Sequence, residues 1–292
     1  MSFSSEQKEK IINDQYKNAC CRRALLSGIL SVKATLDSDT VSFSLEKESY
    51  CEFSAKLISE FYGKAAKIES PRRGGRCKNV SFESKAASKY VRTLSEQELP
   101  FVQKCQACAS SYMKGVFLAC GNISDPQKQY LCEFSPSVND TLLLRVLSMH
   151  SFDAQTSTRQ GKKLIYFKKA SVIEDLCGFI GLTDAMFAIT NTQIEREFLN
   201  NTNRIVNCET NNIGKAVSAS AKQIEAIKAL EAHNLLSSLP EELEYTARLR
   251  LKNDTLSLSQ LSKIFTPPIS KSGLSHRLSK LIEISEQMLK DK

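Results

Sequence analysis

The spacing of apolar residues in the first part of the chain switches between that of a helix and that of a strand. Residues 16–32 and 53–62 place apolar side chains at the three- and four-residue intervals of a helix with one buried side. Apolar and polar residues alternate over 41–45, and 80–82 suit a strand in the same way. This part of the chain therefore predicts the order helix, strand, helix, strand.

The same alternation of helices and strands returns later in the chain. The segments concerned are 130–134 and 164–167 for the strands, and 142–149 and 172–180 for the helices. An internal duplication is the economical explanation, so two half-domains of about 15–97 and 98–205 are expected within one domain over 1–205. The predicted fold class is α+β, with this duplicated α/β domain first in the chain.

The rest of the chain is predicted to be helical. A helix over 183–203 runs into an Asn-rich stretch, and because Asn favours caps and turns, a linker is expected over 206–220. A separate all-α domain is expected over 221–292, with its first helices at 221–232 and 240–251.

Two shorter helices with a turn between them are predicted at the end of this domain. Ser257 and Gln260 have the spacing of a capping box, and Pro267 with Pro268 ends the helix that follows. Ser270 can cap a second helix in which apolar residues share one face. These are Leu274, Leu278, Leu281, Ile282, Met288 and Leu289. The pattern predicts a helix-turn-helix.

The opposite face of the second helix is polar and basic. In a helix-turn-helix, the start of the second helix enters the major groove, where short polar and basic side chains meet base edges and phosphates. The residues predicted to contact DNA there are Lys271, Ser272, Ser275, His276, Arg277 and Lys280. The alternative is a solvated helix face in a protein-binding bundle.

The composition fits a chain with two cores. It has 292 residues, of which 41% are hydrophobic, so one large and one smaller domain are expected. The sequence shows neither a charged-then-apolar leader nor an apolar run of about twenty residues, which predicts a cytoplasmic protein without a secretory signal or a spanning helix.

The net charge of +8 is unevenly distributed, with Lys and Arg gathered over 64–92, 159–169 and 255–282. Clustered cations indicate a polyanion as partner, although a merely solvated basic face is the alternative for each zone. In the first domain the predicted DNA contacts are Arg72, Arg73, Arg76, Lys78, Lys162 and Lys163. Arg196 and Arg204, beside the Asn-rich stretch, are predicted to contact phosphates, unless that stretch is only a connector.

The ten cysteines are scattered, which is typical of reduced thiols that pack as small apolar residues. Cys105 and Cys108 form a Cys-x-x-Cys pair, but no second pair of that spacing exists and the chain has only three His. Because structural zinc needs four ligands in matched spacing, neither a zinc site nor a redox site is predicted. No metal and no cofactor are expected.

Two nine-residue stretches, LSGILSVKA at 26–34 and MKGVFLACG at 113–121, are similar to the LAGLIDADG motif of homing endonucleases. In those enzymes two such helices pack side by side, and the final Asp of each holds the metal that cuts DNA. Here Lys33 and Cys120 stand in those places, and neither supplies the carboxylate that such a metal needs. The small residues of the motif, Gly115 among them, are predicted to let the helices approach closely.

Taken as a whole, the chain resembles the WhiA family, bacterial regulators that join a degenerate LAGLIDADG domain to a C-terminal helix-turn-helix. The stretches that carry the resemblance are NRIVNCE at 203–209, KGVFLACG at 114–121 and ISKSGLSHRL at 269–278. The resemblance implies sequence-specific DNA binding and a role in cell division, chromosome segregation or sporulation. It also implies a terminal module like region four of sigma factors.

A binding protein is therefore favoured over an enzyme. Asp37, Asp39 and Asp125 lie beyond the motif ends, and no phosphate-binding Gly loop or paired-carboxylate motif is found. The leading hypothesis is a nucleoid-associated transcription regulator that binds double-stranded DNA, with no catalytic residues, small-molecule substrate or membrane partner. The alternatives are an adaptor whose first domain binds a division or nucleoid protein, and a residual metal-dependent nuclease. Another transcription factor is a further candidate partner.

Overall fold

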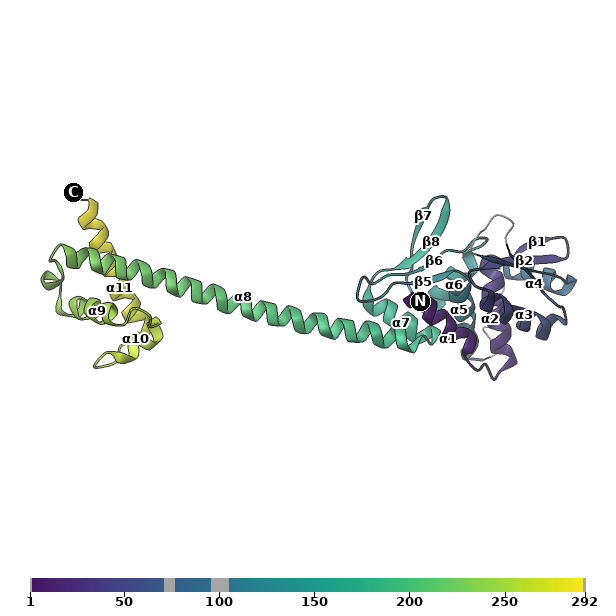
Figure 1. Ribbon diagram of the computed structural model, residues 1–292, viewed down its shortest axis with the longest axis horizontal. Helices are drawn as coiled ribbons and strands as arrows, with labels where there is room; N and C mark the ends of the chain where they lie inside the picture. The colour runs from purple at the N-terminus through teal and green to yellow at the C-terminus, as the bar shows by residue number, and fades with distance from the viewer. Residues whose placement is uncertain (1, 71–76, 96–104, 291–292) are drawn as a thin grey trace. The chain divides into compact units, whose positions relative to one another are not determined.

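The computed structural model describes residues 2–70, 77–95 and 105–290 (Figure 1). The chain divides into two compact units, Met1–Arg196 and Glu197–Lys292, called unit 1 and unit 2 below. Within the described ranges, no helix combines the length and the apolar character needed to cross a membrane.

Unit 1 contains one arrangement of helices and strands twice. After α1 (Phe3–Asn13), the first copy consists of α2 (Ala19–Lys33), β1 (Thr35–Asp37), β2 (Thr40–Leu45), α3 (Glu48–Tyr62), β3 (Lys67–Glu69), β4 (Lys78–Glu83) and α4 (Lys85–Ser95). The second copy consists of α5 (Ala107–Cys120), β5 (Gly121–Ile123), β6 (Cys132–Phe134), α6 (Thr141–Met149), β7 (Gln155–Arg159), β8 (Lys162–Phe167) and α7 (Ala170–Ile180).

Each copy builds an antiparallel sheet with the same strand order, β1-β2-β4-β3 in the first and β5-β6-β8-β7 in the second. In the first sheet Phe43 of β2 lies opposite Val80 of β4, and in the second Phe134 of β6 lies opposite Ile165 of β8. These four side chains are buried. The matching topology supports the internal duplication that the spacing predicted, and it confirms the α+β fold class.

The helices α2 and α5 lie side by side at the centre of unit 1 (Figure 1). Their apolar side chains are almost fully buried, among them Leu25, Leu26 and Ile29 of α2 and Val116 and Phe117 of α5. The two helices that carry the degenerate motif therefore form the core of the unit. The first strand of each sheet follows directly after one of these helices.

Several short elements were not predicted because their sequences lack the apolar periodicity that marks longer ones. The helix α1 buries polar side chains, including Gln7 and Lys8, so it shows no apolar stripe. Strands β1, β3 and β5 have three residues each, too few to show alternation, and all five residues of β7 are exposed.

The expected end of a helix at Asn203 is wrong. A single helix, α8, runs from Thr183 to Ala232 over 50 residues, and it includes the residues of the predicted linker. In a helix, Asn is less favourable than Ala by only about 0.7 kcal/mol at most. An Asn-rich stretch without Pro therefore does not end a helix. The helix predicted over 221–232 is the last part of α8.

Unit 2 also contains η1 (Leu236–Ser238), α9 (Glu241–Lys252), α10 (Leu258–Ile264) and α11 (Lys271–Lys290). Its core is small and made largely of leucine. The buried apolar residues are Ile227, Leu230, Leu236, Ala247, Leu261, Phe265, Leu274, Leu278 and Leu281. The predicted helix-turn-helix is thus formed by α10, the turn after it and α11, packed on α9 and the end of α8.

Candidate nucleic-acid interface

Both helices of the helix-turn-helix begin at the caps that the sequence predicted. At the start of α10 the Ser257 hydroxyl accepts a hydrogen bond from the Gln260 N–H, and the Gln260 side chain accepts one from the Ser257 N–H at 3.0 Å. At the start of α11 the Ser270 hydroxyl accepts a hydrogen bond from the Gly273 N–H at 3.0 Å. These bonds fix where α11 begins and therefore which residues occupy its first turns.

One side of α11 is buried and the other faces solvent. Leu274, Leu278 and Leu281 are at most 1% exposed, as the spacing predicted, while Ile282 and Met288 are only half-buried. On the other side, residues from the first three turns are exposed: Lys271, Ser272, Ser275, His276 and Lys280. We call these five residues, together with Arg277, the α11 face.

Arg277 differs from the other members of the α11 face because it is half-buried and paired. Its Nη2 lies 2.8 Å from Oε2 of Glu242 on α9, and its side chain is 24% exposed. Lys280 has a looser partner, since its Nζ donates to Oε2 of Glu283 at 3.1 Å and both side chains are more than half exposed. Exposed ion pairs of this kind contribute about 0–1 kcal/mol, so a phosphate can replace the carboxylate.

The basic residues of unit 1 that were predicted to contact DNA differ in how exposed they are and in whether they already have a partner. Arg72, Arg73 and Arg76 lie outside the described residues. The ammonium group of Lys78 donates to Oγ of Ser70 at 2.6 Å and lies 3.6 Å from a carboxylate oxygen of Glu48, so it is held within unit 1.

Lys162 and Lys163 lie on the β7–β8 hairpin, which projects from the second sheet (Figure 1). Lys162 is opposite Arg159 in the strand register, and both are exposed. Lys163 is 69% exposed, although its Nζ lies 3.0 Å from Oδ1 of Asp140. Of the unit 1 cations predicted to contact DNA, the described ones that remain exposed to a polyanion are these two lysines.

The two arginines of α8 that were predicted as phosphate contacts are in different situations. Arg196 belongs to unit 1, where its Nη2 donates to the carbonyl oxygens of Pro126 and Gln127 at 2.9 and 3.0 Å. Its guanidinium also lies 4.6 Å from the centre of the Tyr130 ring. Arg196 therefore anchors α8 to a turn of unit 1. Arg204 belongs to unit 2 and is exposed.

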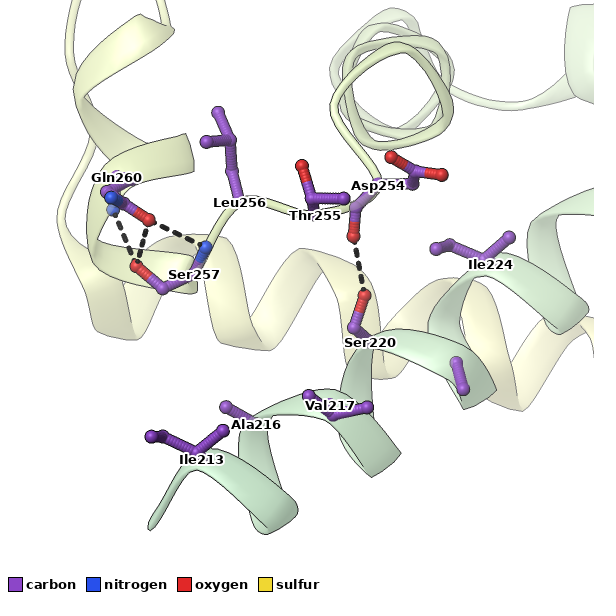
Figure 2. Close-up of a pocket in the computed structure, with 11 residues that line it drawn as sticks. Ile213, Ala216, Val217, Ser220, Ile224, Asp254, Thr255, Leu256, Ser257 and Gln260 are labelled. Atoms are coloured by element: carbon purple, nitrogen blue, oxygen red, sulfur yellow. Dashed lines mark hydrogen bonds between the residues drawn. The ribbon is translucent and has the colours of Figure 1, made fainter. Parts of the chain in front are cut away.

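A cavity in unit 2 is apolar rather than basic. It has a volume of about 480 Å³ and lies between α8 and the segment that leads into α10 (Figure 2). Ile213, Val217 and Ile224 line the α8 side, and the Ser220 hydroxyl donates to the carbonyl oxygen of Asp254 at 3.0 Å. Because its charged lining residue is an aspartate, this cavity does not extend the basic surface.

The ends of the motif helices in unit 1 carry cations and a thiol. Lys33 is the last residue of α2 and donates to Oγ of Ser137 at 2.9 Å, while Cys120 is the last residue of α5. Burial raises the pKa of the Cys120 thiol to about 12, and the nearby ammonium groups of Lys33 and Lys8 only partly offset that shift. The thiol is therefore neutral at pH 7, and the two lysines oppose the binding of a divalent cation.

A cluster of cysteines in unit 1 was missed. The sulfur atoms of Cys20, Cys21, Cys105 and Cys108 all lie within 4.8 Å of one another. The sequence signal was present, since Cys20 and Cys21 form a second pair. They are adjacent rather than spaced as Cys-x-x-Cys, and they lie 85 and 84 residues before Cys105. In the described part of the chain, this is the one group of three or more potential metal ligands, and it contains no carboxylate.

Comparison with known proteins finds both the LAGLIDADG-like domain and the helix-turn-helix domain in this chain. The model of the WhiA LAGLIDADG-like domain matches residues 109–199, and that of the WhiA C-terminal HTH domain matches residues 202–285. The "Probable cell division protein WhiA" of Caldicellulosiruptor bescii is 32% identical over 99% of this chain and 96% of its own length. The chain belongs to the WhiA family. A second protein of that name, from Clostridium acetobutylicum, is 30% identical over 100% of this chain and 99% of its own length.

A solved WhiA structure has the same fold. The crystal structure of full-length DUF199/WhiA from Thermatoga maritima matches with a TM-score of 0.63, at 24% identity over 98% of this chain and 99% of that one. The structure of an N-terminal LAGLIDADG domain of DUF199/WhiA covers 62% of this chain and 90% of its own, at 21% identity and a TM-score of 0.51. Membership of the WhiA family thus confirms the predicted resemblance and the two kinds of domain.

Proposed function

We propose that this WhiA protein is a sequence-specific DNA-binding transcription regulator that acts in cell division, chromosome segregation or sporulation. The observation that carries the proposal is the α11 face. Five of its six polar and basic side chains, all except Arg277, are exposed in the first turns of a capped helix whose other side is held by buried leucines. Such a face suits the major groove, where polar side chains meet base edges and lysines meet phosphates. The relatives named as probable cell division proteins support the biological role.

The chain is proposed to bind double-stranded DNA in the cytoplasm, in association with the nucleoid. Lys162, Lys163 and Arg204 add backbone contacts in this account, since all three are exposed. Backbone contacts position a protein on DNA without reading the sequence, so the specificity is assigned to the α11 face.

Selection of bound duplexes from a random library tests this proposal. The wild-type chain is expected to enrich one sequence family. Ser275→Glu combined with Lys280→Glu places two carboxylates on the α11 face and is expected to abolish the enrichment. Lys290→Glu, near the end of the same helix, is the matched control and is expected to enrich the same sequences. Failure of the wild type to enrich any sequence, with the protein folded, would refute the proposal.

The chain is also proposed to lack nuclease activity. Phosphodiester cleavage by two metals needs carboxylates at the motif ends, and Lys33 and Cys120 supply none. Supercoiled plasmid incubated with the protein and magnesium or manganese is expected to stay intact. Nicking that a chelator suppresses, and that persists after further purification, would contradict this part of the proposal.

A second candidate function is that of an adaptor that binds a division or nucleoid protein through unit 1. It is favoured by two large apolar side chains of α8 in unit 1 that are exposed, Phe187 at 58% and Ile194 at 60%. The charge-reversed α11 variant distinguishes the two functions. If a strain that carries this variant in place of the native gene grows and divides like the wild type, the adaptor is favoured over the regulator.

A further inference from the structure

The four clustered cysteines lie where the two central helices of unit 1 begin. Cys20 and Cys21 are the second and third residues of α2, and Cys108 is the second residue of α5. Cys21 and Cys108 are separated by 87 positions, the same offset that relates the motif ends Lys33 and Cys120. They are therefore equivalent positions in the duplicated halves, at the opposite end of the helices from the degenerate motif residues.

The sulfur atoms are spaced as in a four-cysteine metal site. Sγ of Cys105 lies 3.3 Å from that of Cys108, 3.5 Å from that of Cys21 and 3.7 Å from that of Cys20. In a tetrahedral site with zinc–sulfur bonds of about 2.3 Å, two ligand sulfurs are about 3.8 Å apart. Because all four sulfur atoms lie within 4.8 Å of one another, they need to move by about 1 Å or less to surround one ion. All four thiols are free of disulfides.

The surroundings shield this place from water and bring the N-termini of two helices to it. Cys21 and Cys108 are buried, and Cys20 and Cys105 are half-buried, so an ion bound among them would be shielded from water. The N-termini of α2 and α5 carry no side-chain cap, and the positive ends of the two helix dipoles stabilise negative charge beside them. None of the other six cysteines joins a comparable group within the described ranges.

We propose that Cys20, Cys21, Cys105 and Cys108 bind one Zn²⁺ ion as four thiolates. Each thiol loses its proton to solvent when the ion binds, and no electron is transferred. Four cysteine ligands leave no open position for water or substrate, so the ion has a structural role. It joins the start of α2 to the start of α5 and thereby holds together the two halves of unit 1.

Metal analysis of the full-length chain, purified under reducing conditions without chelator, tests this proposal. One zinc ion per chain is expected. The combined variant Cys105→Ser and Cys108→Ser is expected to contain none. The matched control, Cys77→Ser with Cys208→Ser, removes two exposed thiols outside the cluster and is expected to keep its zinc. Circular dichroism of each variant checks that it is folded.

A second measurement keeps the test informative if the cysteine variant does not fold. Wild-type protein from which metal has been removed is titrated with Co²⁺, and tetrahedral thiolate coordination is expected to give intense visible bands together with sulfur-to-cobalt charge-transfer absorption. Both signals should disappear when Zn²⁺ is added. The proposal is overturned if the reduced wild type neither contains zinc nor binds Co²⁺ in this way, if Cys105 and Cys108 form a disulfide in the protein as isolated from reducing cells, or if the site contains iron instead of zinc.

Discussion

Gly28 of α2 and Gly115 of α5 face each other at the point where the two central helices of unit 1 cross. A Cβ atom added to Gly28 would overlap the carbonyl oxygen of Tyr112, and one added to Gly115 would overlap that of Leu25. The backbones are in direct contact there, so no side chain fits between them. Around this contact, the hydroxyls of Ser31 and Tyr112 are hydrogen-bonded at 2.9 Å.

Replacing either glycine by alanine is expected to destabilise unit 1. Because the overlap is with backbone rather than with a flexible side chain, we expect Gly28→Ala and Gly115→Ala each to lower the free energy of unfolding by about 3 kcal/mol or more. Gly214→Ala, on the part of α8 that belongs to unit 2, is the control and should leave the stability of unit 1 unchanged. A Cβ there meets nothing, and alanine is favoured over glycine in a helix by about 1 kcal/mol. Denaturant unfolding of unit 1, followed by circular dichroism, measures the change. If Gly28→Ala and Gly115→Ala were both as stable as the wild type, the backbones of α2 and α5 could not be in direct contact at these glycines.

Glu242 is expected to weaken DNA binding because it competes with phosphate for Arg277. Glu242→Ala removes that carboxylate and should raise affinity for the selected duplex by about 1 kcal/mol or less. Arg277→Ala should lower affinity, and the effect of Glu242→Ala should shrink in the Arg277→Ala background. Fluorescence anisotropy on the four proteins of this cycle measures the coupling. Equal effects of Glu242→Ala in both backgrounds would mean that the ion pair does not influence the interface.

Arg196 and Arg204, on the same helix, are expected to have opposite effects. Arg196→Ala leaves the carbonyl groups of Pro126 and Gln127 without their charged donor, so unit 1 should lose about 1.5–3 kcal/mol of stability. Its DNA affinity should be unchanged. Arg204→Ala removes an exposed cation and should lower DNA affinity without changing the unfolding transition. Thermal unfolding and anisotropy on both variants check this pair, and the reverse pattern would refute it.

The Cys120 thiol is expected to be unreactive at neutral and mildly alkaline pH. With its pKa raised to about 12 by burial, the thiol stays protonated at pH 8, and the protonated form is a poor nucleophile. Iodoacetamide should therefore modify the exposed Cys77 and Cys208 well before Cys120, as measured by peptide mass spectrometry over time. In urea all three should react at similar rates. Rapid labelling of Cys120 in the folded chain at pH 8 would contradict the raised pKa of this thiol.

The helix-turn-helix could be predicted in detail because its signals are local. The capping residues Ser257, Gln260 and Ser270 lie within a few positions of the turns they stabilise, and Leu274 and Leu278 repeat on one helix. The exposure of the α11 face, apart from the half-buried Arg277, followed from that same helical repeat. In unit 1, the repeated order of elements was likewise visible in the spacing, since its longer helices and strands are amphipathic.

What could not be predicted depends on contacts between residues distant in the sequence. Nothing near Arg196 in the sequence indicates that it donates hydrogen bonds to carbonyl groups 70 and 69 positions earlier. The pair Cys20 and Cys21 meets Cys105 and Cys108 only because α2 and α5 begin side by side. The continuity of α8 was missed for a different reason, namely that a composition rich in Asn was given more weight than its small helical cost.

Salt dependence of duplex binding by the full chain tests the central claim, that the α11 face binds DNA. The logarithm of affinity for the selected duplex should fall linearly with the logarithm of salt concentration, by about 0.9 for each phosphate contact. Lys280→Ala should reduce that slope by about 1, whereas Lys290→Ala should leave it unchanged. Affinity that does not change between low and physiological salt, or a slope that is the same in wild type and Lys280→Ala, would contradict the account.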